Sequence, residues 1–162
     1  GTGKSREGRL LAEKLNFEYV DTDPRIEERE EREIPCIFEE NGEAYFRKVE
    51  SEVLKEILNF QKQLVIATGG GIVLSAENRQ LLQRETFPIL LEASPSVIYN
   101  RIKDDDHRPL LSVKDPRQKI SNLLDKRRQY YNCFSFSVNT DDLTPREICD
   151  YIVNILEEKG LK

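Results

Sequence analysis

The sequence opens with Gly1-Thr2-Gly3-Lys4-Ser5, the stretch that decides the fold class. These residues match the second half of the phosphate-binding pattern G-x-x-x-x-G-K-[ST], in which backbone N–H groups at a helix N-terminus face the phosphates of a nucleotide. In such a loop the ammonium group of Lys4 reaches the β- and γ-phosphates, and the hydroxyl of Ser5 binds Mg²⁺. The same GKS tripeptide also occurs in ordinary loops that enter a helix, so the prediction depends on the pattern of the remaining residues.

Short apolar runs alternate with helical patterns along the rest of the chain. Strands are predicted at 17–20, 64–67, 88–92 and 134–138. Helices are predicted at 4–15, 25–33, 34–40, 43–60, 76–83, 96–103, 116–131 and 145–159. Strands separated by helices indicate an α/β fold with a mainly parallel sheet. A further strand and the first three residues of the phosphate loop, about ten residues in all, are expected before Gly1.

Composition limits the classes of protein to which the chain can belong. Its 162 residues suit one domain, which we expect to span residues 1–162. The net charge of −5 disfavours a nucleic-acid binder, and no apolar run approaches the roughly 20 residues of a membrane helix. Cys36, Cys133 and Cys149 have no metal-binding spacing and are predicted to be buried or half-buried free thiols. We therefore expect a cytoplasmic monomer whose partners are small molecules, with no nucleic acid and no membrane.

Asp21 and Asp23 directly follow the strand predicted at 17–20. In an open α/β sheet, ligands bind at the carboxyl ends of the strands. If the strand conformation continues, alternation points both carboxylates the same way, so that one can help to hold Mg²⁺ near Ser5 and the other can accept a proton from a hydroxyl group. The alternative role of Asp23, which precedes Pro24, is to cap a helix.

Gly69, Gly70 and Gly71 follow the strand predicted at 64–67. Glycine lowers the stability of regular structure, so three in a row indicate positive φ angles or the close approach of another group. A backbone nest that offers N–H groups to an anion fits both needs. A plain tight turn is the simpler alternative.

Arg47 lies inside an otherwise core-facing helical pattern. Glu50 follows one turn later, where its carboxylate can orient the guanidinium group. Such an arginine is either a fork that binds a carboxylate or a surface residue whose stem packs on the core.

Two more arginines are candidates for anion binding. Arg108 lies in the charged segment 104–118, which is predicted to be a mobile lid whose arginine stabilises a transferring phosphate. Arg127 lies between Lys126 and Arg128 on a predicted helix, and such a run of charge is usually a solvated face.

Arg6 and Glu7 depart from the residues expected in the first turn of this helix. Small or apolar side chains are expected where a helix packs on a sheet, whereas these two are charged. A carboxylate is favoured at a helix N-terminus, but here it could also compete with a bound phosphate.

These motifs, in this order, resemble the shikimate kinase family, which comprises small P-loop kinases of the nucleoside-monophosphate-kinase type. The resemblance covers essentially the whole chain. It is carried by GTGKS at 1–5, DTD at 21–23, IPCIFEENGEAYFRKVE at 34–50, ATGGGIVL at 67–74, RPLL at 108–111 and R-x-x-x-Y at 127–131. It implies a three-layer α/β/α P-loop kinase fold with a mainly parallel, five-stranded sheet, a substrate-binding segment at about 24–60 and a lid at about 104–118.

The resemblance also implies an activity and a set of residue roles. The family phosphorylates the 3-hydroxyl of shikimate with ATP and Mg²⁺, giving shikimate 3-phosphate and ADP in the pathway to chorismate and the aromatic amino acids. The residues implied to bind ATP are Gly1, Thr2, Gly3, Lys4, Ser5, Arg6 and Arg108. Those implied to bind shikimate are Asp23, Phe38, Phe46, Arg47, Glu50, Gly69, Gly70, Gly71 and Arg127. Ser5 and Asp21 are implied to hold Mg²⁺, and Asp23, Lys4 and Arg108 to be catalytic, with Asp23 as the base.

Two other functions stay open at this point. Arg47, Gly70 and Arg127 favour an acceptor with a carboxylate without identifying it, so another small-metabolite kinase of the gluconate type is possible. Arg6 and Glu7 leave open a weakly active or inactive nucleotide-binding homologue.

Overall fold

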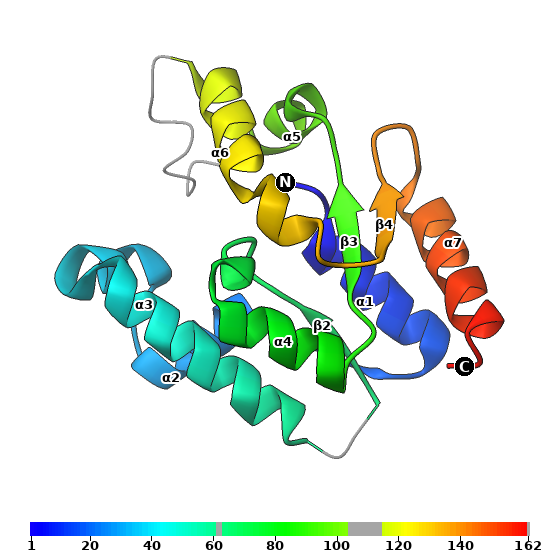
Figure 1. The fold of residues 1–162 in the computed structure, drawn as a ribbon, viewed down its shortest axis with the longest axis horizontal. Coiled ribbons are helices and arrows are strands. Elements are labelled where there is room, and N and C mark those ends of the chain that lie inside the picture. The colour runs from blue at the N-terminus through cyan, green and yellow to red at the C-terminus, as the bar shows by residue number, and fades with distance from the viewer. Residues whose placement is uncertain (61–62, 104–114, 162) are drawn as a thin grey trace. The chain divides into compact units, whose positions relative to one another are not determined.

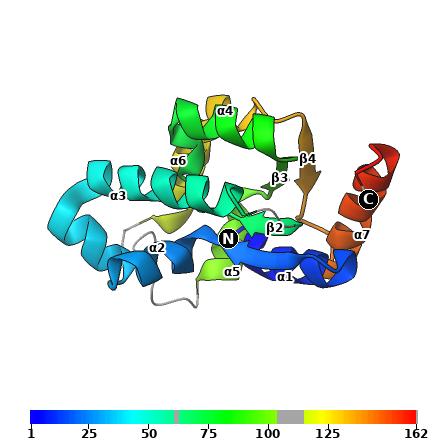
Figure 2. The same ribbon diagram turned by 90° about the horizontal axis from the view of Figure 1, so that it is seen from below.

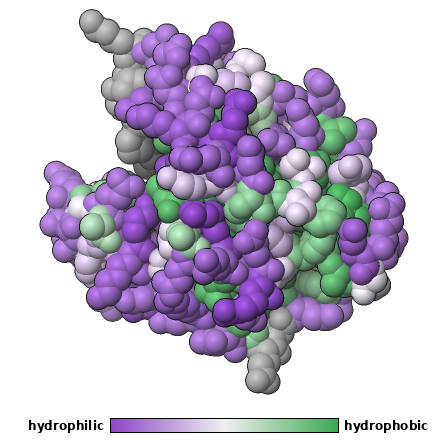
Figure 3. Space-filling model, in the orientation of Figure 1, coloured by the Kyte–Doolittle hydropathy of each residue, from purple (hydrophilic) through white to green (hydrophobic). Residues whose placement is uncertain are grey.

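The structure is a computed structural model that describes residues 1–60, 63–103 and 115–161. The chain forms two compact units, one made of Gly1–Glu7 with Pro88–Lys162 and the other of Gly8–Phe87. Each unit contains one pair of parallel strands and helices that follow them in the chain (Figure 1). Charged and polar side chains cover most of the face drawn in Figure 3, as expected of a chain with 34% charged residues.

The unit Gly8–Phe87 is built on strands β1 (Glu18–Asp21) and β2 (Leu64–Ala67). They pair in parallel, with Glu18 opposite Leu64 and Asp21 opposite Ala67. Parallel neighbours need a crossover connection, which α2 (Thr22–Glu30) and α3 (Ile34–Leu58) supply here. After β2 come the short 3₁₀ helix η1 (Ile72–Leu74) and α4 (Ala76–Glu85). Both strands therefore end at the same edge of this sheet, where α2 and the glycine triplet begin.

The core of this unit is formed by apolar residues of α2 and α3, which pack against each other (Figure 2). Its buried members are Ile26, Ile37, Phe46, Val49, Val53 and Ile57. Their spacing along α3 places them on one face, because residues three and four apart are neighbours on a helix. Gly42 breaks α3 with a φ of 80°, which favours glycine, and it thus separates the two helices predicted at 34–40 and 43–60.

The other unit is built on β3 (Ile89–Glu92) and β4 (Phe136–Asn139), which also pair in parallel, with Ile89 opposite Phe136. The helices α5 (Pro95–Ile102) and α6 (Pro116–Tyr131) pack against each other around Ile98, Ile102 and Ile120. The last helix, α7 (Pro145–Glu158), buries Ile148, Cys149, Ile152 and Val153. Each of the three helices starts with a proline, preceded by a residue whose side chain accepts a backbone N–H bond: Ser94, Asp115 and Thr144.

The phosphate-loop residues Gly1, Thr2 and Gly3 precede α1 (Lys4–Leu15), and Lys4 and Ser5 begin it. The division between the two units falls within α1, after Glu7. Gly3 has a φ of 102°, and its carbonyl accepts bonds from the N–H groups of Arg6 (3.0 Å) and Glu7 (3.0 Å). Gly3 thus holds the backbone conformation that starts the helix, one that other residues rarely adopt.

The predicted α/β class with parallel strands is confirmed, and most elements lie within two residues of their predicted ranges. Four strands lie within the described residues, and the expected fifth would precede Gly1, outside this sequence. Two local predictions are wrong. The strand ends at Asp21, so Asp23 lies inside α2 and strand alternation does not relate the two carboxylates. Asp21, not Asp23, is the N-cap, and its side chain accepts a bond from the N–H of Asp23 at 3.2 Å.

The structure also bears on the thiols and on the absence of a membrane helix that composition predicted. Cys36 is exposed, against the prediction of a buried or half-buried thiol, while Cys133 is half-buried and Cys149 buried. Among the described helices, none combines the length and the apolar character that crossing a membrane requires.

Candidate functional site

The phosphate-binding residues predicted from the sequence lie where α1 begins. Lys4 and Ser5 are the first two residues of α1, with Lys4 half-buried and Ser5 exposed. The first N–H groups of a helix have no partner within that helix, and its dipole makes this end positive. Gly1, Thr2 and Gly3 lead into it as a half-buried loop. The arrangement can bind an anion such as a phosphate.

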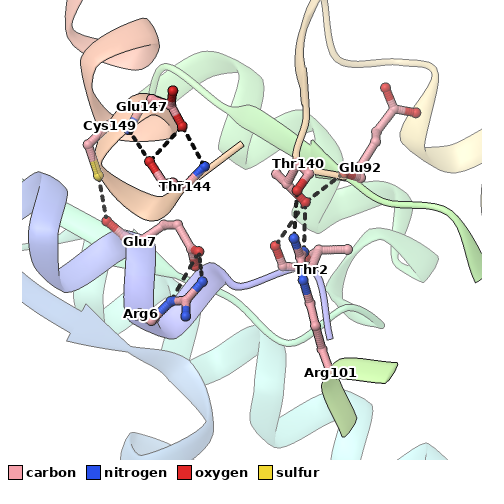
Figure 4. A network of polar contacts seen from close by, with 9 residues as sticks. All are labelled: Thr2, Arg6, Glu7, Glu92, Arg101, Thr140, Thr144, Glu147 and Cys149. Atoms are coloured by element: carbon pink, nitrogen blue, oxygen red, sulfur yellow. Dashed lines mark hydrogen bonds and ion pairs between the residues drawn. The ribbon is translucent and has the colours of Figure 1, made fainter. Parts of the chain in front are cut away.

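A network of polar contacts joins this loop to the ends of β3 and β4 (Figure 4). The buried hydroxyl of Thr140 donates to the carbonyl of Glu92 at 3.0 Å or to that of Thr2 at 3.4 Å. The guanidinium of Arg101 donates to the hydroxyl of Thr140 at 2.9 Å and to its carbonyl at 2.5 Å. Thr140 therefore connects the loop to a strand end, and Arg101 fixes Thr140.

Sequence reasoning missed Arg101 and Thr140. Thr140 follows β4 directly, and a polar residue at the carboxyl end of a parallel strand was a usable signal. Arg101 is 39 residues away in the chain, and no motif around it indicates this contact.

Glu7 is the most unusual residue of the phosphate-binding group. Its side chain is buried, with 2% exposed, although it lies only one turn into α1. One carboxylate oxygen, Oε1, accepts two bonds from Arg6, at 3.0 and 3.3 Å. The thiol of Cys149 in α7 donates to the backbone carbonyl of Glu7 at 3.4 Å. The helix thus begins with a buried negative charge paired to an exposed arginine.

The carboxylate of Asp21 is held at the end of β1. Its Oδ2 accepts a bond from the hydroxyl of Tyr19 at 2.9 Å, and its Oδ1 accepts the N–H of Asp23 at 3.2 Å. Carboxylate oxygens are ligands of the kind that Mg²⁺ takes, directly or through water. No group of three or more His, Cys, Asp or Glu side chains that could hold a metal occurs among the described residues.

Arg47 and Glu50 lie on the same face of α3 and form an ion pair. Nη1 of Arg47 donates to Oε2 of Glu50 at 2.8 Å, and Glu50 is 1% exposed. Glu43, one turn earlier, accepts from Nε at 3.3 Å and Nη2 at 3.2 Å of the same guanidinium. The guanidinium carbon also lies 5.1 Å from the ring centre of Phe46. The predicted orienting contact between Glu50 and Arg47 is therefore present.

The glycine triplet brings Asp23 and the ion pair to one place. A Cβ atom placed on Gly69 would lie 2.9 Å from Oδ1 of Asp23 and 3.1 Å from Oε1 of Glu50. A Cβ atom placed on Gly71 would lie 2.5 Å from Nη2 of Arg47. A Cβ atom at either position would therefore have to displace the ends of these side chains, because real Cβ atoms essentially never come within 3.0 Å of another heavy atom. We call Asp23, Arg47, Glu50, Gly69 and Gly71 the acid–arginine cluster.

A hydrogen bond from the backbone of Gly69 to Thr22 helps to hold the acid–arginine cluster together. The N–H of Gly69 donates to the hydroxyl of Thr22 at 3.1 Å, and Thr22 is completely buried. Gly70, between the two cluster glycines, is half-buried. The end of β2 is thereby tied to the start of α2, which carries Asp23.

The two phenylalanines predicted to line the substrate pocket contact each other. The ring centres of Phe38 and Phe46 are 4.4 Å apart, with the ring planes tilted by 32°. Phe46 belongs to the buried core, and Phe38 packs against that core while staying half-buried. Of the two, Phe38 has the greater remaining surface for a ligand.

Arg127 is the inward member of its charged run in α6. It is half-buried, whereas Lys126 and Arg128 are exposed, and Arg128 is paired with Asp125 at 3.1 Å. The predicted lid and its Arg108 lie outside the described residues over 104–114.

The chain is similar to known proteins in both sequence and structure. The sequence model of the shikimate kinase family matches residues 1–157. A shikimate kinase of Thermodesulfovibrio yellowstonii is 42% identical over 97% of this chain and 90% of that protein. One of Sulfurihydrogenibium sp. is 38% identical over 98% of this chain and 94% of that protein. The solved structure of shikimate kinase from Acinetobacter baumannii in complex with shikimate has a TM-score of 0.92 and 36% identity, covering 99% of this chain and 90% of that one.

Proposed function

The chain belongs to the shikimate kinase family, and we propose that its two groups of residues serve the phosphorylation of the 3-hydroxyl of shikimate by ATP. The products are shikimate 3-phosphate and ADP, on the route to chorismate and the aromatic amino acids. The proposal takes residues 1–162 as one kinase domain that works as a cytoplasmic monomer. Its substrate-binding segment is at about 24–60 and its lid at about 104–118.

The proposal that shikimate is the acceptor rests on the acid–arginine cluster. Shikimate combines a carboxylate with three hydroxyl groups on an apolar ring. Arg47, held by the buried Glu50, offers a preorganised guanidinium for that carboxylate, and a charge-assisted bond of this kind contributes roughly 1.5–3 kcal/mol. Asp23, at the neighbouring Gly69, suits a hydroxyl group. Both kinds of acceptor group thus have a matching partner within one cluster.

Three more groups complete the proposed acceptor site. Arg127 is the half-buried arginine of α6, and we assign it as a second partner for the carboxylate. Phe38 and Phe46 provide an apolar wall for the ring carbons. The backbone of Gly69, Gly70 and Gly71 is assigned to the same site, since successive N–H groups can bind anionic or hydroxyl oxygens, although the N–H of Gly69 itself donates to Thr22.

The start of α1 is assigned to the phosphates of ATP. Backbone N–H groups from Gly1 to Arg6 and the ammonium group of Lys4 would neutralise the β- and γ-phosphates. Arg108 in the lid is assigned to the same phosphates. Phosphoryl transfer requires little covalent chemistry of the protein, so these residues act by positioning the phosphates and stabilising their charge.

Mg²⁺ is assigned to Ser5 and Asp21. A hydroxyl and a carboxylate are the hard oxygen donors that Mg²⁺ accepts, and it usually keeps several waters, so Asp21 can act through one of them. The fit rests on the carboxylate of Asp21, which the hydroxyl of Tyr19 orients at 2.9 Å. When bound, the ion neutralises charge on the phosphates.

Asp23 is assigned as the base of the transfer. Its carboxylate takes the proton of the 3-hydroxyl while that oxygen forms a bond to the γ-phosphorus and the bond from this phosphorus to the bridging oxygen breaks, which leaves the electron pair on ADP. Removal of the proton makes the oxygen a better nucleophile.

The test is to measure ADP release by the purified protein with ATP and Mg²⁺, using shikimate or gluconate as acceptor. Release that depends on shikimate and is absent with gluconate is the expected result. A folded protein that releases ADP only with gluconate, or binds ATP without any turnover, would contradict the proposal.

A further inference from the structure

We propose that the buried carboxylate of Glu7 is a built-in negative charge beside the phosphate loop, which weakens nucleotide binding and thereby sets the affinity for the β-phosphate of ATP and ADP. The proposal rests on the proposed function, because it takes the start of α1 as the site that binds these phosphates.

The carboxylate of Glu7 lies directly against the loop. A Cβ atom placed on Gly3 would be 2.5 Å from Cδ and 2.6 Å from Oε1 of Glu7, so the carboxylate fills the space beside the Cα atom of Gly3. Figure 4 shows the side chain extending from α1 toward Arg6, away from the Glu7 carbonyl that Cys149 contacts. A negative charge thus adjoins the residue from which the anion-binding N–H groups begin.

The charge of Glu7 is only partly compensated by its neighbours. Arg6 bonds to Oε1, but Oε2 is buried and has no hydrogen-bond partner among the described residues. Arg6 itself is 63% exposed, and water weakens ion pairs at such a position. The remaining support for the carboxylate is the positive end of α1.

A bound phosphate and the carboxylate of Glu7 would compete for stabilisation by the same positive groups. Both are stabilised by the N-terminus of α1, and each repels the other as a like charge. If the guanidinium of Arg6 turns toward the phosphate, the carboxylate loses the ion pair that Arg6 provides and becomes a buried charge without that compensation. Either way, nucleotide binding is less favourable than it would be with a neutral residue at position 7.

The test compares Glu7→Gln with Glu13→Gln by titration calorimetry against Mg²⁺-ADP, Mg²⁺-ATP and shikimate. Glu13 is in the same helix but exposed, so its variant removes an equal charge away from the loop. Glu7→Gln is expected to lower the Kd for both nucleotides about tenfold. This is the effect expected from removing the repulsion of one nearby unit charge at a partly screened site. The Kd for shikimate, and every Kd of Glu13→Gln, should stay unchanged.

Arg6→Ala provides an independent variant, since Arg6 is largely exposed and pairs with Glu7. Removing the partner of Glu7 is expected to raise the Kd for ADP several-fold, and adding Glu7→Gln should abolish most of that change. Equal nucleotide affinity of the wild type and Glu7→Gln, even with a different melting temperature, would overturn the proposal and leave Glu7 with a purely structural role. Tighter nucleotide binding by Glu7→Gln together with no turnover of shikimate would instead count against the proposed function alone.

Discussion

Arg47 donates to the buried carboxylate of Glu50 over 2.8 Å, from one turn earlier in α3. The side chains are 21% and 1% exposed, so the guanidinium is held from its buried side while part of it stays accessible. Contact with the ring of Phe46 and the close approach of Gly71 restrict it further. An arginine restrained in this way loses little side-chain entropy when it binds a carboxylate, which is the property expected of a binding residue.

Arg47→Ala should mainly weaken the binding of shikimate. Loss of a charge-assisted partner corresponds to about 1.5–3 kcal/mol, so we expect KM for shikimate to rise by roughly tenfold to a hundredfold while KM for ATP changes little. The measurement is steady-state kinetics with each substrate varied in turn. Lys48→Ala is the matched control, because Lys48 is the next residue of α3, is 73% exposed and should leave both KM values unchanged. A rise confined to KM for ATP would show that the assignment of Arg47 is wrong.

Asp23→Asn tests the proposed base. The amide keeps the shape of the side chain beside Gly69 but cannot take the proton, so we expect kcat to fall by about 10²–10⁴-fold with the Kd for ATP unchanged. Glu28→Gln, an exposed change in the same helix, serves as control. An unchanged kcat for Asp23→Asn would remove Asp23 as the base.

Elements with a strong local pattern could be predicted from the sequence. The helix from Lys4 to Leu15 and the strand from Leu64 to Ala67 have the predicted bounds, because apolar periodicity and an unbroken apolar run determine them locally. The end of β1 was not predictable in the same way. Asp21 caps α2 by accepting the N–H of Asp23 and is also bonded to Tyr19, while Gly69, 47 residues away, donates to Thr22 at the start of α2.

In the candidate site, too, some contacts could be predicted from the sequence and others could not. Glu50 could be paired with Arg47 from sequence alone, since three residues separate them on a helix. The burial of Glu7 could not, because it depends on how the carboxylate fills the space beside the Cα atom of Gly3, which no residue pattern indicates. The contact of Arg101 with Thr140 joins a helix to the end of a strand and leaves no periodic signal.

The two cluster glycines should give different kinetic defects when each is changed to alanine. Gly71 has a φ of −91°, which alanine adopts freely, so the effect of Gly71→Ala comes from displacing the guanidinium of Arg47 and should appear as a higher KM for shikimate. Gly69→Ala displaces the carboxylates of Asp23 and Glu50 and should also lower kcat. Misplacement of such groups by about 1 Å can change rates by up to a hundredfold. Wild-type values of kcat and KM for both variants would mean that the cluster does not bind substrate.

Thr144→Ala should destabilise the protein in a manner that depends on pH. Thr144 caps α7, and its hydroxyl and N–H both donate to Glu147, at 2.6 and 2.8 Å. These two bonds, the hydroxyl first, hold the pKa of Glu147 below its ordinary value of 4.5. A lowered pKa in the folded state adds stability that is present above pH 4.5 and is lost as the pH falls through the lowered pKa. Loss of a cap typically lowers Tm by about 2–4 °C in a chain of this length.

The expected result is that the Tm difference between wild type and Thr144→Ala is largest near pH 7 and narrows below pH 4.5. It does not vanish there, since the hydroxyl of Thr144 also accepts the N–H of Glu147 at 3.3 Å whatever the charge of that residue. Ser75→Ala is the matched control, because Ser75 caps α4 by accepting from Asn78 and has no carboxylate as third residue of the helix. Thermal unfolding followed by circular dichroism between pH 3 and pH 7 measures both differences, and a Tm difference for Thr144→Ala that stays as constant as that of Ser75→Ala would contradict the role of the Glu147 charge.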